Sequence, residues 1–408
     1  MESPFTISFF LGLVESYCEY VLPTVPVISG AEFRSAIESL AHSDADQSLV
    51  YSLAAQTLNL APAQPSRPRL TEDDATTLYR AALSSRRPVF SQDQITVRSI
   101  VVSLLASIGM FATDRDIDMG YYYSREAITG IQILRVDDAQ HHASFSWQER
   151  AQRERLHWLL FIHDRFHSIS SFRPAVLPAL PTLPEPDTSL PPGVSEWFNE
   201  LICIFRVVDD DFVRNWTDKS SPFLTLEWIE KKQAELCDDT NKWSEGFRIL
   251  TDMQQVDLIV TRYWLRTLVW QMALHKFVLT SNVHPGHHQD FLSLAFPIRL
   301  SHQLRHCLIT KPREAVEVHG TGILQKIFEI TCAVADLLQY VVPTTCSSED
   351  YLAHVDCFLF LYEFLLKMSK FYHVERAVLT AKWEAVQATF PGTLGENLGS
   401  SSWSSPAT

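Results

Sequence analysis

Apolar residues recur at intervals of three and four through most of this 408-residue chain. That spacing places them on one face of an α-helix, which a shared core can bury. Glycine is scarce, with 13 residues, and no apolar run leads through a glycine-rich loop into a helix, as a nucleotide-binding α/β fold requires. The spacing therefore predicts an all-α protein with helices over residues 31–59, 70–84, 95–112, 120–135, 150–170, 194–214, 225–236, 254–280, 290–309, 320–342 and 348–388.

One segment interrupts the helical pattern. Residues 174–192, PAVLPALPTLPEPDTSLPP, hold seven of the 21 prolines. Because proline fixes φ and lacks a backbone N–H, this segment is expected to cross the surface in an extended form. We expect one large helical domain over residues 1–390, built of two packed halves, about 1–173 and 193–390, that the crossing joins. The Ser-rich end, residues 391–408, is predicted to be a disordered tail.

The charge balance limits what the chain can bind directly. The formal net charge is -14 at pH 7, and no run of Lys and Arg is longer than two. DNA binding depends on clustered basic side chains that contact phosphates. We therefore expect any contact with DNA to be indirect, through a DNA-binding partner.

The seven cysteines are scattered, and no two form a CxxC pair. This pattern favours neither a disulfide framework nor a zinc finger, and no cofactor is predicted. Two apolar stretches, 99–112 and 357–368, are shorter than the roughly 20 residues that a membrane span needs. They are predicted to be buried core helices.

Residues 163–167, HDRFH, resemble the HExxH helix of zinc metalloproteases. His163 and His167 project from one helix face, as two zinc ligands would. The acid between them is Asp164 rather than Glu, and Ser170 and Arg173 stand where a metzincin has Gly and His. Because the helix is apolar nearly all round, we interpret both histidines as packed or hydrogen-bonded in a core, and we predict no metal site.

Two other stretches suggest chemistry without completing a motif. Residues 207–213, VVDDDFV, resemble the aspartate-rich motif of terpene cyclases, but Val213 stands in place of its third acid. We expect these aspartates to form a helix cap or a solvated helix face. Residues 284–290, HPGHHQD, gather three histidines in what we expect to be an exposed loop. No catalytic residue is predicted, although a helical metal-dependent enzyme such as a terpene cyclase stays an alternative.

Residues 153–178, RERLHWLLFIHDRFHSISSFRPAVLP, resemble the signature block of the regulatory domain of fungal-specific transcription factors, also called the middle homology region. That block has a basic start, an aromatic-rich helix, a D-R pair, and then R-P before an extended stretch. The matching residues here are Arg153, Arg155, Trp158, the pair Asp164-Arg165 and the pair Arg173-Pro174. The R-P pair is expected to end the helix, because a residue before proline leaves the α region.

Three further blocks, at 121–138, 256–274 and 317–338, look like the branch of maltose and amylase activators. The resemblance implies a nuclear transcription regulator of a fungal gene set, for carbon-source use or a secondary-metabolite cluster. Such factors usually begin with a six-cysteine binuclear zinc cluster, and Cys18 is the only cysteine before residue 203. We expect a regulatory domain that acts with a DNA-binding partner or as a homodimer. The alternative is a fragment of a zinc-cluster factor whose DNA-binding exon is missing.

A helical regulatory domain can bind a small effector between its helices and shift between two states. Aromatic rings and a guanidinium suit a polyhydroxylated or acidic ligand. The candidates for lining such a pocket are Trp158, Arg165, Arg173, Trp264, Trp270 and His319. The alternative is that the tryptophans fill the core and that Arg165 is a buried charge paired with Asp164 or another neighbour.

Overall fold

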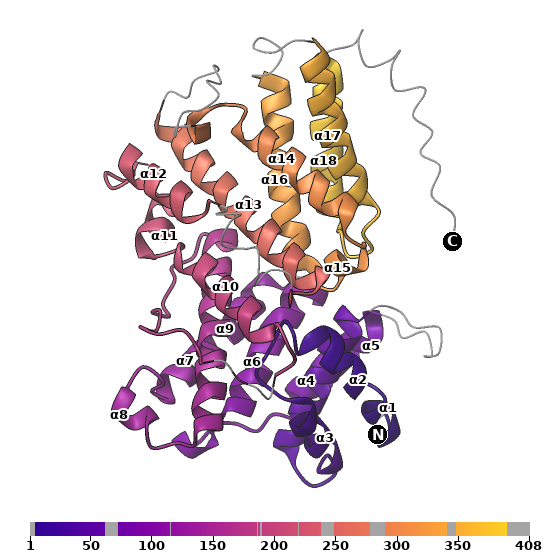
Figure 1. The fold of residues 1–408 in the computed structure, drawn as a ribbon. Helices are drawn as coiled ribbons and strands as arrows, with labels where there is room; N and C mark the ends of the chain where they lie inside the picture. The colour runs from indigo at the N-terminus through magenta and orange to yellow at the C-terminus, as the bar shows by residue number, and fades with distance from the viewer. Residues whose placement is uncertain are drawn as a thin grey trace. The chain divides into compact units, whose positions relative to one another are not determined.

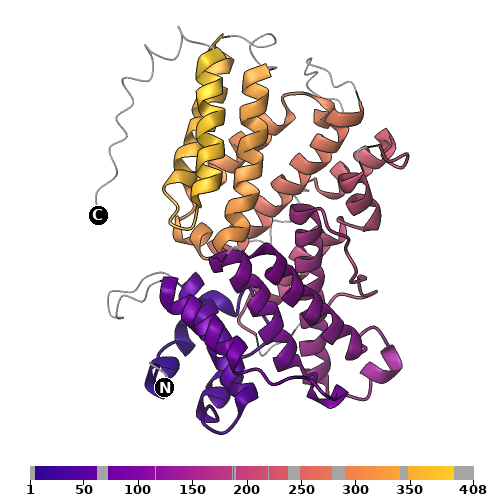
Figure 2. The same ribbon diagram turned by 180° about the vertical axis from the view of Figure 1, so that it is seen from behind.

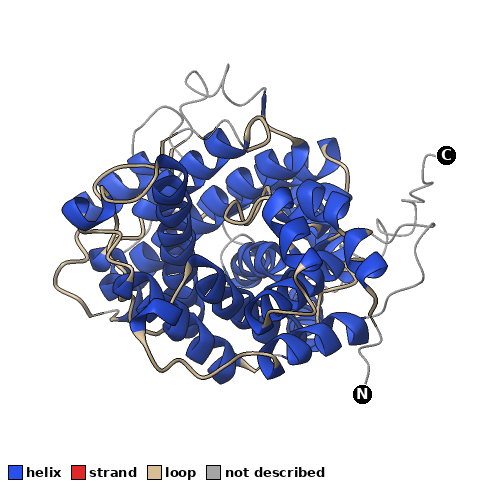
Figure 3. Cartoon of the chain, turned by 90° about the horizontal axis from the view of Figure 1, so that it is seen from below, coloured by secondary structure: helices blue, strands red, loops and turns tan. Residues whose placement is uncertain are grey.

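The computed structural model describes residues 5–61, 72–114, 116–185, 187, 190–218, 220–237, 249–277, 290–340 and 348–389. These residues form helices joined by loops, and no β-strand occurs among them (Figure 3). The predicted all-α fold is confirmed. The predicted tail, 391–408, and all but Asp290 of the stretch 284–290 lie outside the described residues.

The chain forms two compact units. The first comprises Met1–Thr225, Ala234–Leu258 and Lys311–Gly320, and the second comprises Leu226–Gln233, Ile259–Thr310 and Thr321–Thr408. The proline-rich segment therefore belongs to the first unit. A regulatory domain over residues 1–390 with halves at about 1–173 and 193–390 stays a prediction.

The helices of the first unit are coloured from indigo to magenta and rose in Figure 1, except α15, which is orange. They are α1 (Ile7–Leu11), α2 (Val14–Ser16), α3 (Gly30–Glu38), α4 (Asp44–Leu60), α5 (Glu72–Ser84), α6 (Val97–Gly109), α7 (Ile117–Ile133), α8 (Ala139–His142), α9 (Trp147–Ser171), α10 (Val194–Arg206), α11 (Asp210–Thr217) and α15 (Glu314–Glu317). Short π-helices follow α2 and α6, at Tyr17–Val21 and Met110–Asp114, and a 3-10 turn spans Gln92–Gln94.

The core of the first unit is built around α4 and α9. Every residue of α4 from Ser48 to Thr57 is buried, and α9 buries most of its 25 residues, including Trp158 and Phe161. Around them, α4 packs against α5 and α6, and α7 packs against α6 and α9. Both helices bury polar as well as apolar side chains, because other helices cover them on most sides.

The helices α6 and α7 approach closely at Gly130. A Cβ atom at this position would lie 2.7 Å from Cγ1 of Ile100. Glycine therefore permits a distance between the two helices that a larger residue would prevent. The close contact brings Ile133 and Leu134, at the end of α7, beside residues 95–98 at the start of α6.

The second unit contains α14 (Phe296–Thr310), α16 (Gly320–Tyr340), α17 (Ser348–Leu366) and α18 (His373–Thr389), together with most of α12 (Leu226–Glu235) and α13 (Asp252–Lys276). Figures 1 and 2 show α16, α17 and α18 side by side in orange and yellow. A hydrogen bond of 3.3 Å joins Gln339 of α16 to the Lys382 carbonyl of α18. The Tyr362 and Thr380 hydroxyls, 3.2 Å apart, join α17 to α18.

Three predicted helices are each divided in two in the structure. The prediction over 31–59 becomes α3 and α4, because Ser43 accepts a hydrogen bond from the Asp46 N–H and begins a new helix. The prediction over 194–214 becomes α10 and α11, because Asp209 accepts from the Phe212 N–H at 2.9 Å. This confirms the expected cap in the aspartate run. The prediction over 348–388 becomes α17 and α18. Such caps are local side-chain contacts that apolar periodicity does not detect.

None of the described helices combines the length and the apolar character that crossing a membrane requires. The two apolar stretches of the sequence fall on α6 and α17, where Leu104 and Phe358 are buried.

Candidate functional site

The signature block forms α9 and the extended segment that follows it. Ser146 caps the helix by accepting from the Glu149 N–H at 3.3 Å. The helix ends at Ser171, and Phe172 takes the left-handed conformation with φ +52°. Arg173 and Pro174 come next, so the expectation that the R-P pair ends the helix is confirmed. We call residues 174–185 the strap.

Asp164 and Arg165 hold the backbone of the strap. The Asp164 carboxylate accepts hydrogen bonds from the N–H groups of Val176, at 2.8 Å, and Leu177, at 2.9 Å. Arg165 donates to the carbonyl of Leu177 at 3.3 Å. Both side chains are at least 95% buried. The D-R pair thus satisfies both backbone polar groups of one strap residue, as a neighbouring β-strand would.

Residues nearer the start of α9 hold the rest of the strap. A ring nitrogen of His157 lies 2.9 Å from the Pro178 carbonyl, and the Trp158 indole donates to the Thr182 carbonyl at 3.2 Å. Just beyond the strap, Arg155 pairs with Asp187 at 2.6 Å. Later strap residues therefore meet earlier helix residues, so the strap runs antiparallel to α9. Because its prolines have no N–H, the strap cannot form regular backbone hydrogen bonds. Side chains of the helix therefore donate to its carbonyls instead.

Arg125 of α7 completes the contact between α9 and the strap. It pairs with Asp164 at 3.2 Å and donates to the Pro174 carbonyl. The Tyr121 ring lies between two guanidinium groups, with Arg125 at 4.6 Å and Arg173 at 4.3 Å from its centroid. Arg173 also pairs with Asp118 at 2.7 Å. Cation–π contacts of this kind hold the helix end against α7.

Arg165 also carries a charge pair. Its guanidinium lies 3.1 Å from the carboxylate of Asp210 and 4.8 Å from the centroid of Phe161. The partner is therefore Asp210 of α11, whereas Asp164 pairs with Arg125. The interpretation of Arg165 as a buried charge with a partner agrees with this geometry.

His167 is packed in the core. Its ring stacks on Phe111 with centroids 4.3 Å apart, and the ring of His163 lies 6.0 Å away. Burial lowers the pKa of His167 to about 3, so the ring is neutral at physiological pH. Across the described residues, no three His, Cys, Asp or Glu side chains are grouped to hold a metal ion.

The other candidate pocket residues belong to two different units. Trp264 and Trp270 belong to the second unit and are buried, and their indoles donate to Glu329 at 2.6 Å and to the Ser293 carbonyl at 3.0 Å. His319 belongs to the first unit, with a ring nitrogen 2.9 Å from the Met253 carbonyl. An effector role for the six candidates stays a prediction, and the two cavities below have other linings.

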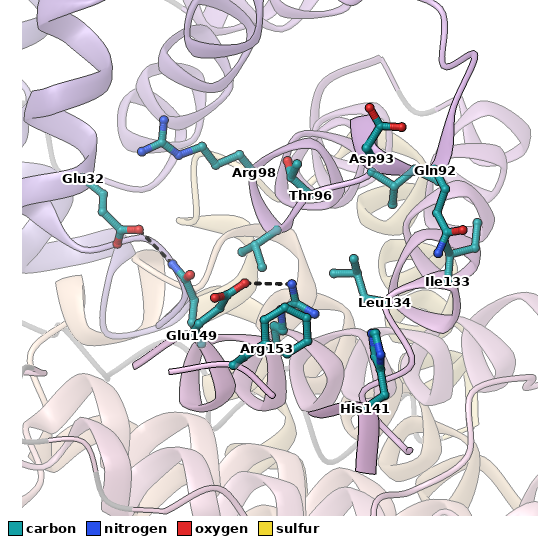
Figure 4. A pocket seen from close by; sticks show the side chains of 14 residues that line it. Glu32, Gln92, Asp93, Thr96, Arg98, Ile133, Leu134, His141, Glu149 and Arg153 are labelled. Atoms are coloured by element: carbon teal, nitrogen blue, oxygen red, sulfur yellow. Dashed lines mark hydrogen bonds and ion pairs between the residues drawn. The ribbon is translucent and has the colours of Figure 1, made fainter. Parts of the chain in front are cut away.

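The larger cavity is a groove in the first unit with a volume of about 780 Å³. We call it the polar groove. Figure 4 shows His141, Glu149 and Arg153 along one side and Arg98, Thr96 and Asp93 along the other. Its lining residues are Glu32, Gln92, Asp93, Ile95, Thr96, Val97, Arg98, Ile133, Leu134, His141, Phe145, Glu149, Gln152 and Arg153.

Polar contacts hold the walls of the polar groove in place. Arg153 pairs with Glu149 at 2.8 Å, and its guanidinium lies 3.6 Å from the centroid of Phe145. Gln152 donates to Glu32 at 3.0 Å and to the Val27 carbonyl at 2.8 Å. These fixed partners orient the side chains before any ligand arrives.

A second cavity, of about 470 Å³, lies near the start of α4. Arg86 and Arg87 line it, and each already has a carboxylate partner, Glu126 and Asp44 respectively. Its cations are therefore neutralised by residues of the chain itself.

Sequence patterns pointed to α9 but not to the polar groove. Of the fourteen lining residues, only Arg153 belongs to the signature block, at its basic start. The i,i+4 spacing of Glu149 and Arg153 was the one local indication that these two share a helix face.

No model of a protein family matches the chain. No solved structure matches it either.

Curated proteins do match over about half of the chain. The maltose fermentation regulatory protein MAL63 of Saccharomyces cerevisiae is 25% identical over 238 residues, 56% of this chain and 47% of that protein. The probable sucrose utilization protein SUC1 of Candida albicans is 26% identical over 221 residues, 52% of this chain and 41% of that protein. The respiratory transcription factor ZNF1 of S. cerevisiae is 24% identical over 250 residues, 59% of this chain and 50% of that protein.

The chain spans about half the length of the curated relatives that it matches. These relatives are named as maltose fermentation regulatory proteins, a probable sucrose utilization protein and a respiratory transcription factor, and they include the maltose branch that the three further blocks resemble. The resemblance of this chain to the regulatory domain of fungal transcription factors is thereby confirmed.

Proposed function

We propose that this chain regulates transcription of a fungal gene set for carbon-source use, through its helical regulatory domain and a DNA-binding partner. The observation that carries the proposal is the signature helix α9 with its strap, in a chain whose relatives include maltose fermentation regulatory proteins and a probable sucrose utilization protein. A secondary-metabolite gene cluster is the second candidate target, because the family resemblance implies it equally.

The charge of the chain supports a partner. With a net charge of -14, the chain is repelled by the phosphate backbone of DNA unless a basic protein is present. The partner is a DNA-binding transcription factor or a second copy of this chain, and the place of action is the nucleus. The matched relatives are regulators, so the proposed role is not enzymatic.

Two features of the first unit, the strap and the polar groove, support a role in regulation. The strap is held to α9 by side chains rather than by continuous secondary structure. The polar groove lies at the start of the same helix, where Glu149 and Arg153 line it. A regulator works by shifting between states, and a ligand or partner that contacts one state better shifts the balance.

Expression profiling of a deletion strain tests this function. We expect a defined group of genes to change together when the strain meets a new carbon source, and reintroduced wild-type chain to restore them. If no group of genes changes together under any carbon source, the chain is not such a regulator.

A further inference from the structure

We propose that the polar groove binds a neutral, hydroxyl-rich molecule about the size of a disaccharide. The binding itself is a property of the purified chain. The role of that molecule as an effector rests on the proposed regulatory function.

The charges of the groove disfavour an anionic ligand. Three carboxylates, of Glu32, Asp93 and Glu149, and two guanidinium groups, of Arg98 and Arg153, line it. Both guanidinium groups already have a carboxylate partner, Arg98 with Asp46 at 2.6 Å and Arg153 with Glu149 at 2.8 Å. An anion would meet repulsion from the carboxylates and would find no cation without a partner among these residues.

The hydrogen-bonding groups favour hydroxyls in particular. Carboxylates only accept hydrogen bonds, guanidinium groups only donate, and the amides of Gln92 and Gln152 do both. A hydroxyl is both a donor and an acceptor. Adjacent hydroxyls of one ligand can therefore donate to the carboxylates and accept from the guanidinium groups. Planar carboxylate, amide and guanidinium groups can each contact two hydroxyls at once.

Arg153 supplies a second and independent indication. Its side chain is 90% buried and lines the groove, and its Nε has no hydrogen-bond partner within the described residues. A buried N–H without an acceptor is unfavourable, so native structures usually provide one from protein, water or ligand. A ligand oxygen at this wall would fill that need after a small rotation of the guanidinium.

The volume and the apolar residues of the polar groove also suit a ligand of disaccharide size. A volume of about 780 Å³ is within the range of roughly 300–1,000 Å³ that is typical of small-molecule sites. Ile95, Val97, Ile133 and Leu134 provide apolar surface for the C–H faces of a sugar ring. The lining comes from α3, from residues 92–98 at the start of α6, from the end of α7 and from α8–α9, so one ligand would contact four parts of the first unit.

Calorimetric titration of the full-length chain tests the proposal. The probes are maltose, sucrose and cellobiose as neutral disaccharides, maltose 1-phosphate as an anion of similar size, and the glucosamine disaccharide as a dication. We expect at least one neutral disaccharide to bind with a Kd of about 1 mM or below and the two charged sugars to bind at least about tenfold more weakly. Equal or tighter binding of a charged sugar, or no binding by any neutral one, would overturn the proposal.

Two substitutions place the binding in the groove. Arg153→Met keeps the buried stem but removes the donors, and Glu149→Gln, at a half-exposed position, replaces the ionised acceptor by an amide that can still accept from Arg153. Each is expected to weaken binding about tenfold or more. The matched control is Glu317→Gln, because Arg313 and Glu317 form the same kind of i,i+4 pair in α15, away from the groove.

The control variant should bind within about twofold of wild type. If Glu149→Gln and Arg153→Met bind as the control does, the ligand site is elsewhere and the proposal is wrong. The titration contains no promoter and no partner, so a negative binding result would not contradict the proposed regulatory function. A negative expression result would likewise not contradict binding of the sugar by the groove.

Discussion

The Leu177 N–H donates a 2.9 Å hydrogen bond to Asp164, and the Leu177 carbonyl accepts one from Arg165, the next residue along α9. Adjacent side chains of opposite charge thus hold both backbone groups of one strap residue. Charged partners make such hydrogen bonds stronger than neutral ones. The physical role of the D-R pair in the signature block is therefore to fix the segment that follows the helix.

Replacing Asp164 by Ala should destabilise the first unit strongly. The change removes the carboxylate partner of the buried Leu177 N–H, of the Val176 N–H and of the partly buried Arg125 guanidinium. We expect a loss of about 3 kcal/mol in the free energy of unfolding, measured with urea. Asp211→Ala, which breaks the exposed pair with Arg214, is the control and should cost much less. Equal losses for the two variants would show that Asp164 does not anchor the strap.

Two tryptophans of α9 allow a matched comparison. Trp158 is fully buried and donates to the Thr182 carbonyl, whereas Trp147 is 36% exposed and donates to the Glu185 side chain, also at 3.2 Å. Trp158→Phe should cost about 2–3 kcal/mol, because it opens a cavity and leaves a strap carbonyl without its donor. Trp147→Phe should cost less than about 1 kcal/mol. A larger loss for Trp147→Phe would contradict the account of the strap.

His167 should make the stability of the protein depend on pH. Burial lowers its pKa to about 3 in the folded chain, and an unfolded histidine titrates near about 6.5. Between these values the unfolded chain binds a proton that the folded chain does not. The stabilisation is therefore complete above about pH 6.5 and falls as the pH drops, by up to about 1.4 kcal/mol per pH unit.

His167→Phe should keep the stack on Phe111 and reduce this slope between pH 6.5 and 5. The exposed His306, replaced in the same way, is the control. Urea unfolding at several pH values measures both slopes. A His167→Phe slope equal to that of wild type would show that this ring is not the titrating group.

Glu329 in the second unit should give a dependence of opposite sign. Burial raises the pKa of its carboxyl group, although Trp264 and Gln325 donate to it. The folded chain then holds a proton that the unfolded chain releases, so the contribution of Glu329 to stability falls as the pH rises above about 4.5. Glu329→Gln keeps an acceptor for the Trp264 indole, and the stability of wild type relative to this variant should decrease from pH 4.5 to 8. A constant difference over that range would contradict the raised pKa.

The sequence predicted the features that depend on local chemistry. Apolar periodicity predicted most helices, and proline chemistry predicted the end of α9 before Arg173. The aspartate run indicated a cap or a solvated helix face, but not that Asp209 would divide the helix predicted over 194–214. Each of these depends on residues within a few positions of one another. The division of 31–59 at Ser43 was missed, since the apolar spacing continues across the cap.

The polar groove could not be predicted in this way. Glu32 and Gln152 are 120 positions apart in the chain, and only the folded first unit brings them within 3.0 Å. The partner of Arg165 was missed for the same reason. The neighbouring Asp164 was the named candidate, but in the fold Arg165 forms its ion pair with Asp210 of α11. Contacts between distant segments depend on packing that a single sequence does not reveal.

Chromatin immunoprecipitation of the tagged chain tests the regulatory claim most directly. The account predicts enrichment at the promoters of the genes whose expression changes in the deletion strain, and loss of that enrichment when the DNA-binding partner is removed. Enrichment at none of these promoters, with the chain present at its normal level, would contradict the account.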